Sequence, residues 1–104
     1  MQRFNPKKNG TLAYTANGVS QNFALPGGGG LLLRIQNSGA NIAYGQLCND
    51  ANVSVSIPSS TAGGGFPIFA NQPPIQVTMA AGDTRIALIS AGNSTVQVTR
   101  GDAI

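Results

Sequence analysis

Charged side chains and the usual catalytic residues are scarce in this sequence. Only 9% of its 104 residues are charged, and the chain contains no histidine, glutamate or tryptophan. A serine or cysteine nucleophile would therefore lack a histidine base, and a carboxylate pair would have to come from the isolated Asp50, Asp83 and Asp102. These aspartates lack the close spacing of a metal-binding loop and stand beside turn residues. We therefore expect no enzymatic activity, no metal site and no cofactor.

Cysteine and long apolar runs are scarce as well. The single cysteine, Cys48, cannot form a disulfide within the chain, and we expect it to be a small buried side chain. The longest apolar runs, such as Leu31 to Leu33, are much shorter than the roughly 20 residues that span a bilayer. The polar start of the chain lacks the apolar core of an export signal. We expect neither a membrane span nor a secretory signal.

The few charges are distributed unevenly. The net charge is +3, and Arg3, Lys7 and Lys8 account for it because the remaining arginines and aspartates balance. A neutral domain does not offer the basic patch that nucleic acids require, so we expect no specific nucleic-acid binding. Residues 1–10 are basic and have no strand pattern, which predicts an extended N-terminal arm. Its candidate partner-binding residues are Arg3, Phe4, Lys7 and Lys8.

Uncharged polar side chains take the place of the missing charges. Asparagine, glutamine, serine and threonine occupy 32 of the 104 positions. A freely diffusing monomer usually stays soluble through surface charges of both signs. A neutral surface of amides and hydroxyls instead suits a protein that packs against neighbours.

Short stretches of alternating apolar and polar residues recur along the chain. Residues 53–57, 75–79 and 94–100 alternate strictly, as strands with one solvated face do, whereas 31–37 and 84–90 are more continuously apolar. The latter pattern predicts strands that lie in the middle of a sheet or are covered on both faces. Turn residues separate the stretches, and no window has a helical period. The sequence therefore predicts an all-β protein, a single small antiparallel β-sandwich or jelly roll of about eight strands over residues 11–104, preceded by the arm of residues 1–10.

Two glycine-rich segments raise the question of a phosphate-binding loop. Gly27 to Gly30 precede Leu31, and Gly63 to Gly65 precede Phe66. A phosphate-binding loop leads into the N-terminus of a helix and usually includes a lysine, whereas an apolar strand pattern follows the first glycine run. We interpret the first segment as a corner between sheets and the second as an exposed loop.

The alternation also predicts which side chains meet in the core. Residues 16–18 are expected to form the turn of a hairpin, and Phe66 and Phe69 are expected to close one end of the sandwich. The expected core consists of the apolar members of the predicted strands: Leu33, Ile35, Val55, Ile57, Val77, Ile86, Leu88, Val96 and Val98.

The order of segments over residues 31–104 carries a resemblance. These segments are LRIQNSG, AYG, the proline-bearing FPIFANQPP, AGDTRIALISAG and a closing VQVTRGD. In this order they resemble the small all-β virion proteins of tailed bacteriophages. The resemblance implies a capsid-associated cement or decoration protein, made in the host cytoplasm and located on the virion, that binds the major capsid protein or another virion protein and forms a homotrimer.

Two alternatives remain open beside this expectation. A head-tail or tail structural component could carry the same pattern of strands and turns. A carbohydrate-binding or cell-surface-binding β-sandwich module is the other alternative, and it would need clustered exposed aromatic side chains or acidic metal loops.

Overall fold

The computed structural model describes residues 4–27, 30–80 and 82–103, and of residues 4, 5, 7–9 and 103 it describes the backbone alone. The described residues form strands and connecting loops, with no helix among them. All strand pairs are antiparallel, and they build two four-stranded sheets. The expected small antiparallel sandwich is thereby confirmed. Its eight strands are β1 (Phe4–Ala16), β2 (Gln21–Ala24), β3 (Leu32–Asn37), β4 (Ala43–Cys48), β5 (Phe66–Ile68), β6 (Ile75–Thr78), β7 (Arg85–Ser90) and β8 (Ser94–Ala103).

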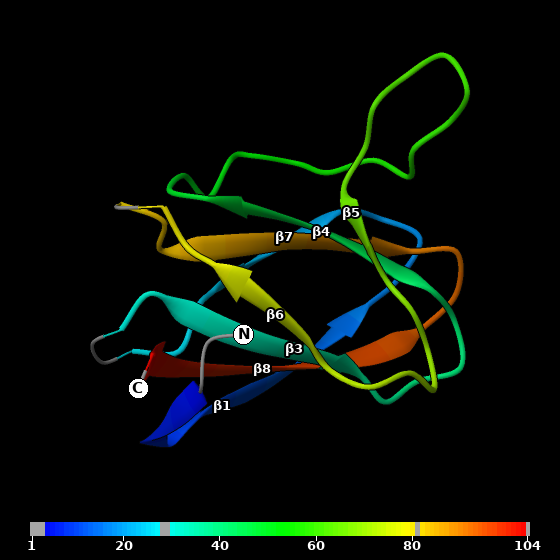
Figure 1. Cartoon of the computed structure of the whole chain (residues 1–104). Helices are drawn as coiled ribbons and strands as arrows, with labels where there is room; N and C mark the ends of the chain where they lie inside the picture. Colours follow the sequence, from blue (N-terminus) through cyan, green and yellow to red (C-terminus); the bar gives the residue numbers. More distant parts are fainter. Residues whose placement is uncertain (1–3, 28–29, 81, 104) are drawn as a thin grey trace.

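The strand order is that of a jelly roll. One sheet has the order β1-β8-β3-β6 and the other β2-β7-β4-β5. The first strand therefore pairs with the last, the second with the seventh, the third with the sixth and the fourth with the fifth. This nesting is what results when one long antiparallel pair is rolled up into two facing sheets. Figure 1 shows the two sheets packed face to face, and the start of β1 lies beside the end of β8, where Phe4 is opposite Ala103.

The inner faces of the two sheets form one apolar core. Leu33 and Ile35 of β3 and Val96 and Val98 of β8 meet Ile86 and Leu88 of β7, and all six side chains are buried. The alternation of Val96 and Val98 with less buried residues is the reason that the period of two identifies them in the sequence, whereas Ile86 and Leu88 flank the buried Ala87 in a continuously apolar stretch. Of the other expected core residues, Val55 is buried and Val77 is half-buried, but Ile57 is 41% exposed, so its assignment to the core was wrong.

The segment between β4 and β5 explains the error at Ile57. Residues 53–57 were expected to form a strand but join neither sheet, because they belong to a strap, residues 49–65, that runs along the outer side of the β2-β7-β4-β5 sheet (Figure 1). The Asn22 side chain donates to the carbonyls of Asp50 (3.1 Å) and Val53 (2.9 Å), and the Val55 amide donates to the Ser20 hydroxyl (2.9 Å). The strap thus bonds to side chains rather than to a neighbouring strand.

The strap also accounts for the continuous apolar character of β7. Ala87 points to the opposite face of the sheet from Ile86 and Leu88, yet it is fully buried. A central strand covered on both faces is what the sequence predicted for residues 84–90, and the structure confirms it.

The turn at residues 16–18 does not form the expected hairpin. It joins β1 of one sheet to β2 of the other, so its flanking strands are not hydrogen-bonded to each other. The Asn17 side chain accepts a hydrogen bond from the Val19 amide (3.0 Å), and its carbonyl accepts one from the Ser90 amide (2.8 Å). Turn residues such as Asn and Gly indicate that the chain reverses direction, but not which strand the next segment pairs with. The sequence therefore could not distinguish a hairpin from a crossing between sheets.

Truncating a core leucine tests this packing. Leu88→Ala removes a fully buried side chain from β7, so we expect the free energy of unfolding to fall by about 2 to 5 kcal/mol. Leu31→Ala is the matched control, because Leu31 is 52% exposed and its loss should cost less than about 1 kcal/mol. Urea denaturation followed by circular dichroism gives both values. Equal losses would contradict the core described here.

Candidate interaction surfaces

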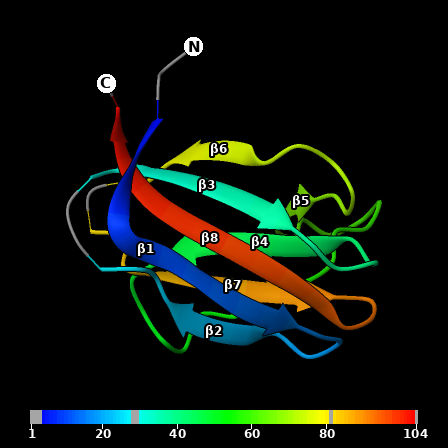
Figure 2. The same cartoon turned by 90° about the horizontal axis from the view of Figure 1, so that it is seen from below.

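The N-terminal segment begins the outermost strand of one sheet. Phe4 lies opposite Ala103 and Pro6 opposite Gly101, so the expected boundary of the arm at residue 10 falls inside β1. Figure 2 shows the start of β1 beside the end of β8. The register shifts between Pro6 and Thr11, and this irregular stretch contains Lys7 and Lys8.

Of the four expected partner-binding residues, Arg3 lies outside the described residues. Phe4, Lys7 and Lys8 are placed by their backbone only, and their side chains lie outside the description. The structure therefore places these three residues along one edge strand, and their contact with a partner stays a prediction.

The glycine-rich corner at residues 26–30 is held by an arginine from β8. The Arg100 guanidinium donates from Nε to the Gly30 carbonyl and from Nη1 to the Pro26 carbonyl, both at 3.0 Å. Gly30 has a φ of 97°, a conformation that suits glycine, and the chain continues directly into a strand. The interpretation as a corner is therefore confirmed.

The tip of the strap, residues 57–64, is exposed along its whole length. The Ser59 amide donates to the Ala62 carbonyl (2.9 Å), and the Ser59 hydroxyl accepts a hydrogen bond from the Ala62 amide (3.1 Å). This local turn gives the tip a defined shape, and the tip projects away from the sheet at the upper right of Figure 1. The exposed side chain of Ile57 stands at its base.

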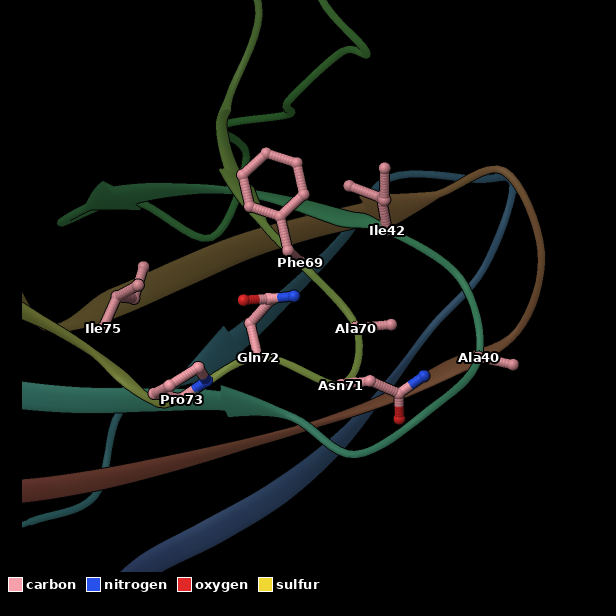
Figure 3. A pocket seen from close by; sticks show the side chains of 8 residues that line it. All are labelled: Ala40, Ile42, Phe69, Ala70, Asn71, Gln72, Pro73 and Ile75. Atoms are coloured by element: carbon pink, nitrogen blue, oxygen red, sulfur yellow. The ribbon is translucent and has the colours of Figure 1, made fainter.

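An open pocket lies at the end of the sandwich opposite the start of β1 and the end of β8 (Figure 1). Its volume is about 620 Å³, and no ionisable side chain lines it. Phe69 was expected to help close this end of the core, but its ring is 51% exposed and projects in the same direction as Ile42 (Figure 3). Phe66, by contrast, is half-buried against the core. The lining residues are Ala40, Ile42, Phe69, Ala70, Asn71, Gln72, Pro73 and Ile75.

Sequence reasoning missed this pocket. It is built from the β3–β4 loop and from the β5–β6 loop with the start of β6, two segments that are distant in the sequence. One signal was present, because Phe69 stands after the end of β5 and shortly before Pro73 and Pro74, in a segment that cannot continue the strand. An aromatic residue in such a turn is more often exposed than one inside an alternating strand.

A buried asparagine holds the loops around the pocket. The Asn37 side chain donates to the carbonyls of Asn41 (2.6 Å) and Ile68 (3.0 Å). Its Oδ1 accepts hydrogen bonds from the Gly39 amide (2.9 Å) and the Ser94 hydroxyl (2.6 Å). One amide group thus joins β8, the β3–β4 loop and the end of β5.

A second buried polar group lies on the other side of the sandwich. The Tyr14 hydroxyl donates to the Ala24 carbonyl, and its ring stacks on Phe23 with the ring centres 4.7 Å apart. Burial raises the pKa of Tyr14 from 10.0 to about 12, although the positive charge of Arg85 opposes this shift. The neutral phenol is thus the form that the fold favours.

Removing the Asn37 amide tests its role as an organiser of the pocket. Asn37→Ala removes the hydrogen-bond partner of the buried Ile68 carbonyl and of the Gly39 amide, so we expect the free energy of unfolding to fall by about 1 to 3 kcal/mol. Ser38→Ala is the control, because its exposed hydroxyl makes a single long hydrogen bond of 3.3 Å to the Thr95 carbonyl. Denaturant unfolding compares the two variants. If Ser38→Ala lowered the free energy of unfolding as much as Asn37→Ala, the hydrogen bonds of Asn37 would not be what holds the loops around the pocket.

The pKa of Tyr14 predicts a loss of stability at high pH. Its pKa is higher in the folded chain than the usual 10.0, so the neutral phenol contributes to the stability of the fold. This contribution to the free energy of unfolding is complete below pH 10 and disappears as the pH rises to about 12. The difference in phenolate absorbance between the wild type and Tyr14→Phe should have its midpoint near pH 12. A midpoint near pH 10 in the folded protein would contradict the burial of the hydroxyl.

The described residues show no group of three or more metal-ligating side chains, and they include no helix of the length and apolarity needed to cross a membrane. The described part of the chain offers three surfaces for contact: the edge strand β1, which contains Lys7 and Lys8, the exposed tip of the strap, and the pocket, whose lining carries no ionisable side chain. Comparisons with known protein families, with curated protein sequences and with solved structures find no match for this chain.

Proposed function

We propose that this chain is a structural protein of a virus particle, attached to the capsid as a cement or decoration protein. The observation that carries the proposal is a surface with few charges that presents large apolar side chains at its loops. Val19, Ile42, Ile57 and Phe69 are all more than a third exposed, in a chain of which 9% of the residues are charged. Apolar side chains that gather on one region of a surface usually mark a contact with another protein.

Three of these side chains, Val19, Ile42 and Phe69, are grouped by the topology. The β1–β2 loop with Val19, the β3–β4 loop with Ile42 and the β5–β6 loop with Phe69 lie at the same end of the sandwich, on the right in Figure 1. The basic start of β1 lies toward the opposite end, beside the end of β8. The two ends therefore differ in character: one is apolar and neutral, and the other is charged, with Lys7 and Lys8 in β1 and Asp102 in β8 opposite Asn5.

Two different contact surfaces would suit a protein that joins neighbouring capsid subunits. The apolar loops and the start of β1 lie toward opposite ends of the sandwich, so each can face a different neighbour (Figure 1). If each end binds a different subunit of the assembled shell, the protein binds the shell better than the free subunits. Binding only to the assembled state stabilises that state by mass action.

The fold is compatible with this function but does not single it out. Jelly rolls occur in viral capsid proteins and in lectins, and a fold by itself hosts many functions. A head-tail or tail component would use the same surfaces. A carbohydrate-binding module would stack sugars on aromatic rings, and the pocket described here has one such ring, Phe69, rather than a cluster.

Cosedimentation tests the proposal directly. The purified chain is mixed with capsids assembled from the major capsid protein of the same genome, and with the unassembled capsid protein as the comparison. We expect it to sediment with the capsids and not to bind the free subunits. Equal binding to both, or binding to neither, would contradict a cement function.

The contribution of Lys7 and Lys8 to capsid attachment is tested by removing their charges. Because residues 4–6 pair with β8, a deletion would also remove strand contacts, so Lys7→Gln combined with Lys8→Gln is the cleaner change. We expect this variant to lose about tenfold in affinity for capsids at low salt and to match the wild type at high salt, because salt screens exposed charges. Gln36→Ala, an exposed change in the middle of a sheet, is the control. Unchanged binding of the double variant at low salt would assign attachment to the apolar end instead.

A further inference from the structure

The second half of β1 is an edge strand without the usual protection. β1 lies at the margin of its sheet, with β8 on one side and no strand beyond it in Figure 1. Exposed edges are normally blunted by proline, lysine or an irregular register, because a regular edge can pair with another chain. Pro6, Lys7, Lys8 and the register shift protect the first half of β1 in this way, but Thr11–Ala16 has none of these features.

The register shows which backbone groups of this edge point outward. The Ser38 amide donates to the Thr95 carbonyl, so Thr95 and every second residue after it in β8 bond to β3. Val96 and Val98 therefore bond to β1, where they lie opposite Tyr14 and Leu12. The amides and carbonyls of the alternate β1 residues, Thr11, Ala13 and Thr15, point away from the sheet.

A side-chain contact agrees with this assignment. Thr11 lies opposite Thr99 at a position where the two residues exchange no backbone hydrogen bonds, and such positions bring side chains closest together. Their hydroxyl oxygens are 2.8 Å apart. The side chains of Thr11, Ala13 and Thr15 are all exposed on the outer face of the sheet.

We infer that this edge pairs with the same edge of a second copy of the chain, antiparallel and about a twofold axis at Ala13. In that register Ala13 lies opposite Ala13 of the second copy, and Thr11 lies opposite its Thr15. All three are residues with outward-pointing backbone groups, so each pair exchanges hydrogen bonds as in a regular antiparallel ladder. The β1-β8-β3-β6 sheet of one copy and the same sheet of the second copy then form one continuous sheet.

The side chains of the edge support a second copy as the occupant. Leu12 points toward the core side of the sheet, opposite the buried Val98, yet it is 42% exposed because no described strand lies on the other side of β1. In the pair it lies opposite Tyr14 of the second copy, which covers part of its surface. The antiparallel arrangement also places Lys7 and Lys8 of the two copies at opposite ends of the paired segment, so their charges do not meet.

A twofold pair is a different assembly from the homotrimer that the resemblance implies, and particle mass separates the two. Analytical ultracentrifugation of the isolated protein should give a mass twice that of the 10.6 kDa chain. A monomer over the whole accessible range of concentration, or a trimer, would overturn the inference. The measurement does not involve capsids, so its outcome is independent of the proposed function.

Charge substitutions at the axis test the register. Ala13→Lys places two lysines directly opposite each other, and Ala13→Asp does the same with two carboxylates, so each variant should dissociate. An equimolar mixture of the two should restore the pair, because lysine then faces aspartate. Gln97→Lys, which adds the same charge to the exposed face of β8 opposite Ala13, is the matched control and should leave the pair intact.

Proline at the axis tests the backbone contact. The Ala13 amide points away from β8, so Ala13→Pro should keep the fold, as circular dichroism and the melting temperature will show. It removes a hydrogen-bond donor from each copy and should weaken the pair by about tenfold or more. If the charge variants and the proline variant all remain paired as tightly as the wild type, the contact does not lie at this edge.

Discussion

The position of β8 between β1 and β3 is the constraint on which the rest of this structure depends. It joins the two ends of the chain in one ladder and places Val96 and Val98 in the core. Arg100 of the same strand fixes the glycine-rich corner, and Ser94 bonds to the asparagine that organises the pocket. The hydrogen-bonding alternation of β8 also decides which backbone groups of β1 face outward. Both ends of the sandwich and its free edge are thus set by one strand.

The abundance of asparagine and serine has a structural use. Amide and hydroxyl side chains connect elements that are not neighbours in a ladder: Asn22 and Ser20 hold the strap, and Asn37 and Ser94 hold the loops around the pocket. Among the described residues, every buried side-chain nitrogen and oxygen has a hydrogen-bond partner. Because these ties are uncharged, they do not weaken in salt as exposed ion pairs do, and the surface remains free of strong electrostatic repulsion between packed copies.

The strands and the core could be predicted because a period of two reports directly on burial in a sheet. Val96 and Val98 were identified in this way, whereas Leu33 and Leu88 stand in stretches that are more continuously apolar. The same period misled at residues 53–57, since an extended strap that rests on a sheet also buries alternate side chains. The pocket could not be predicted, because it depends on which loops the roll brings together. The basic residues of the N-terminal segment were found from charge alone, but no local pattern reveals that Asn5 and Pro6 pair with the other end of the chain.

The nesting of the strand pairs has a consequence for how the molecule forms. The innermost pair, β4 with β5, joins neighbouring segments, whereas the pairing of Phe4 with Ala103 closes a loop of almost the whole chain. Closing a larger loop costs more chain entropy, and folds dominated by such distant contacts form slowly. The chain entropy lost at each step is smallest if the strand pairs form from β4 and β5 outward, with β1 added last. Its outer edge would then be complete only in the finished fold, so a nascent or partly folded chain would not yet offer that edge to another copy.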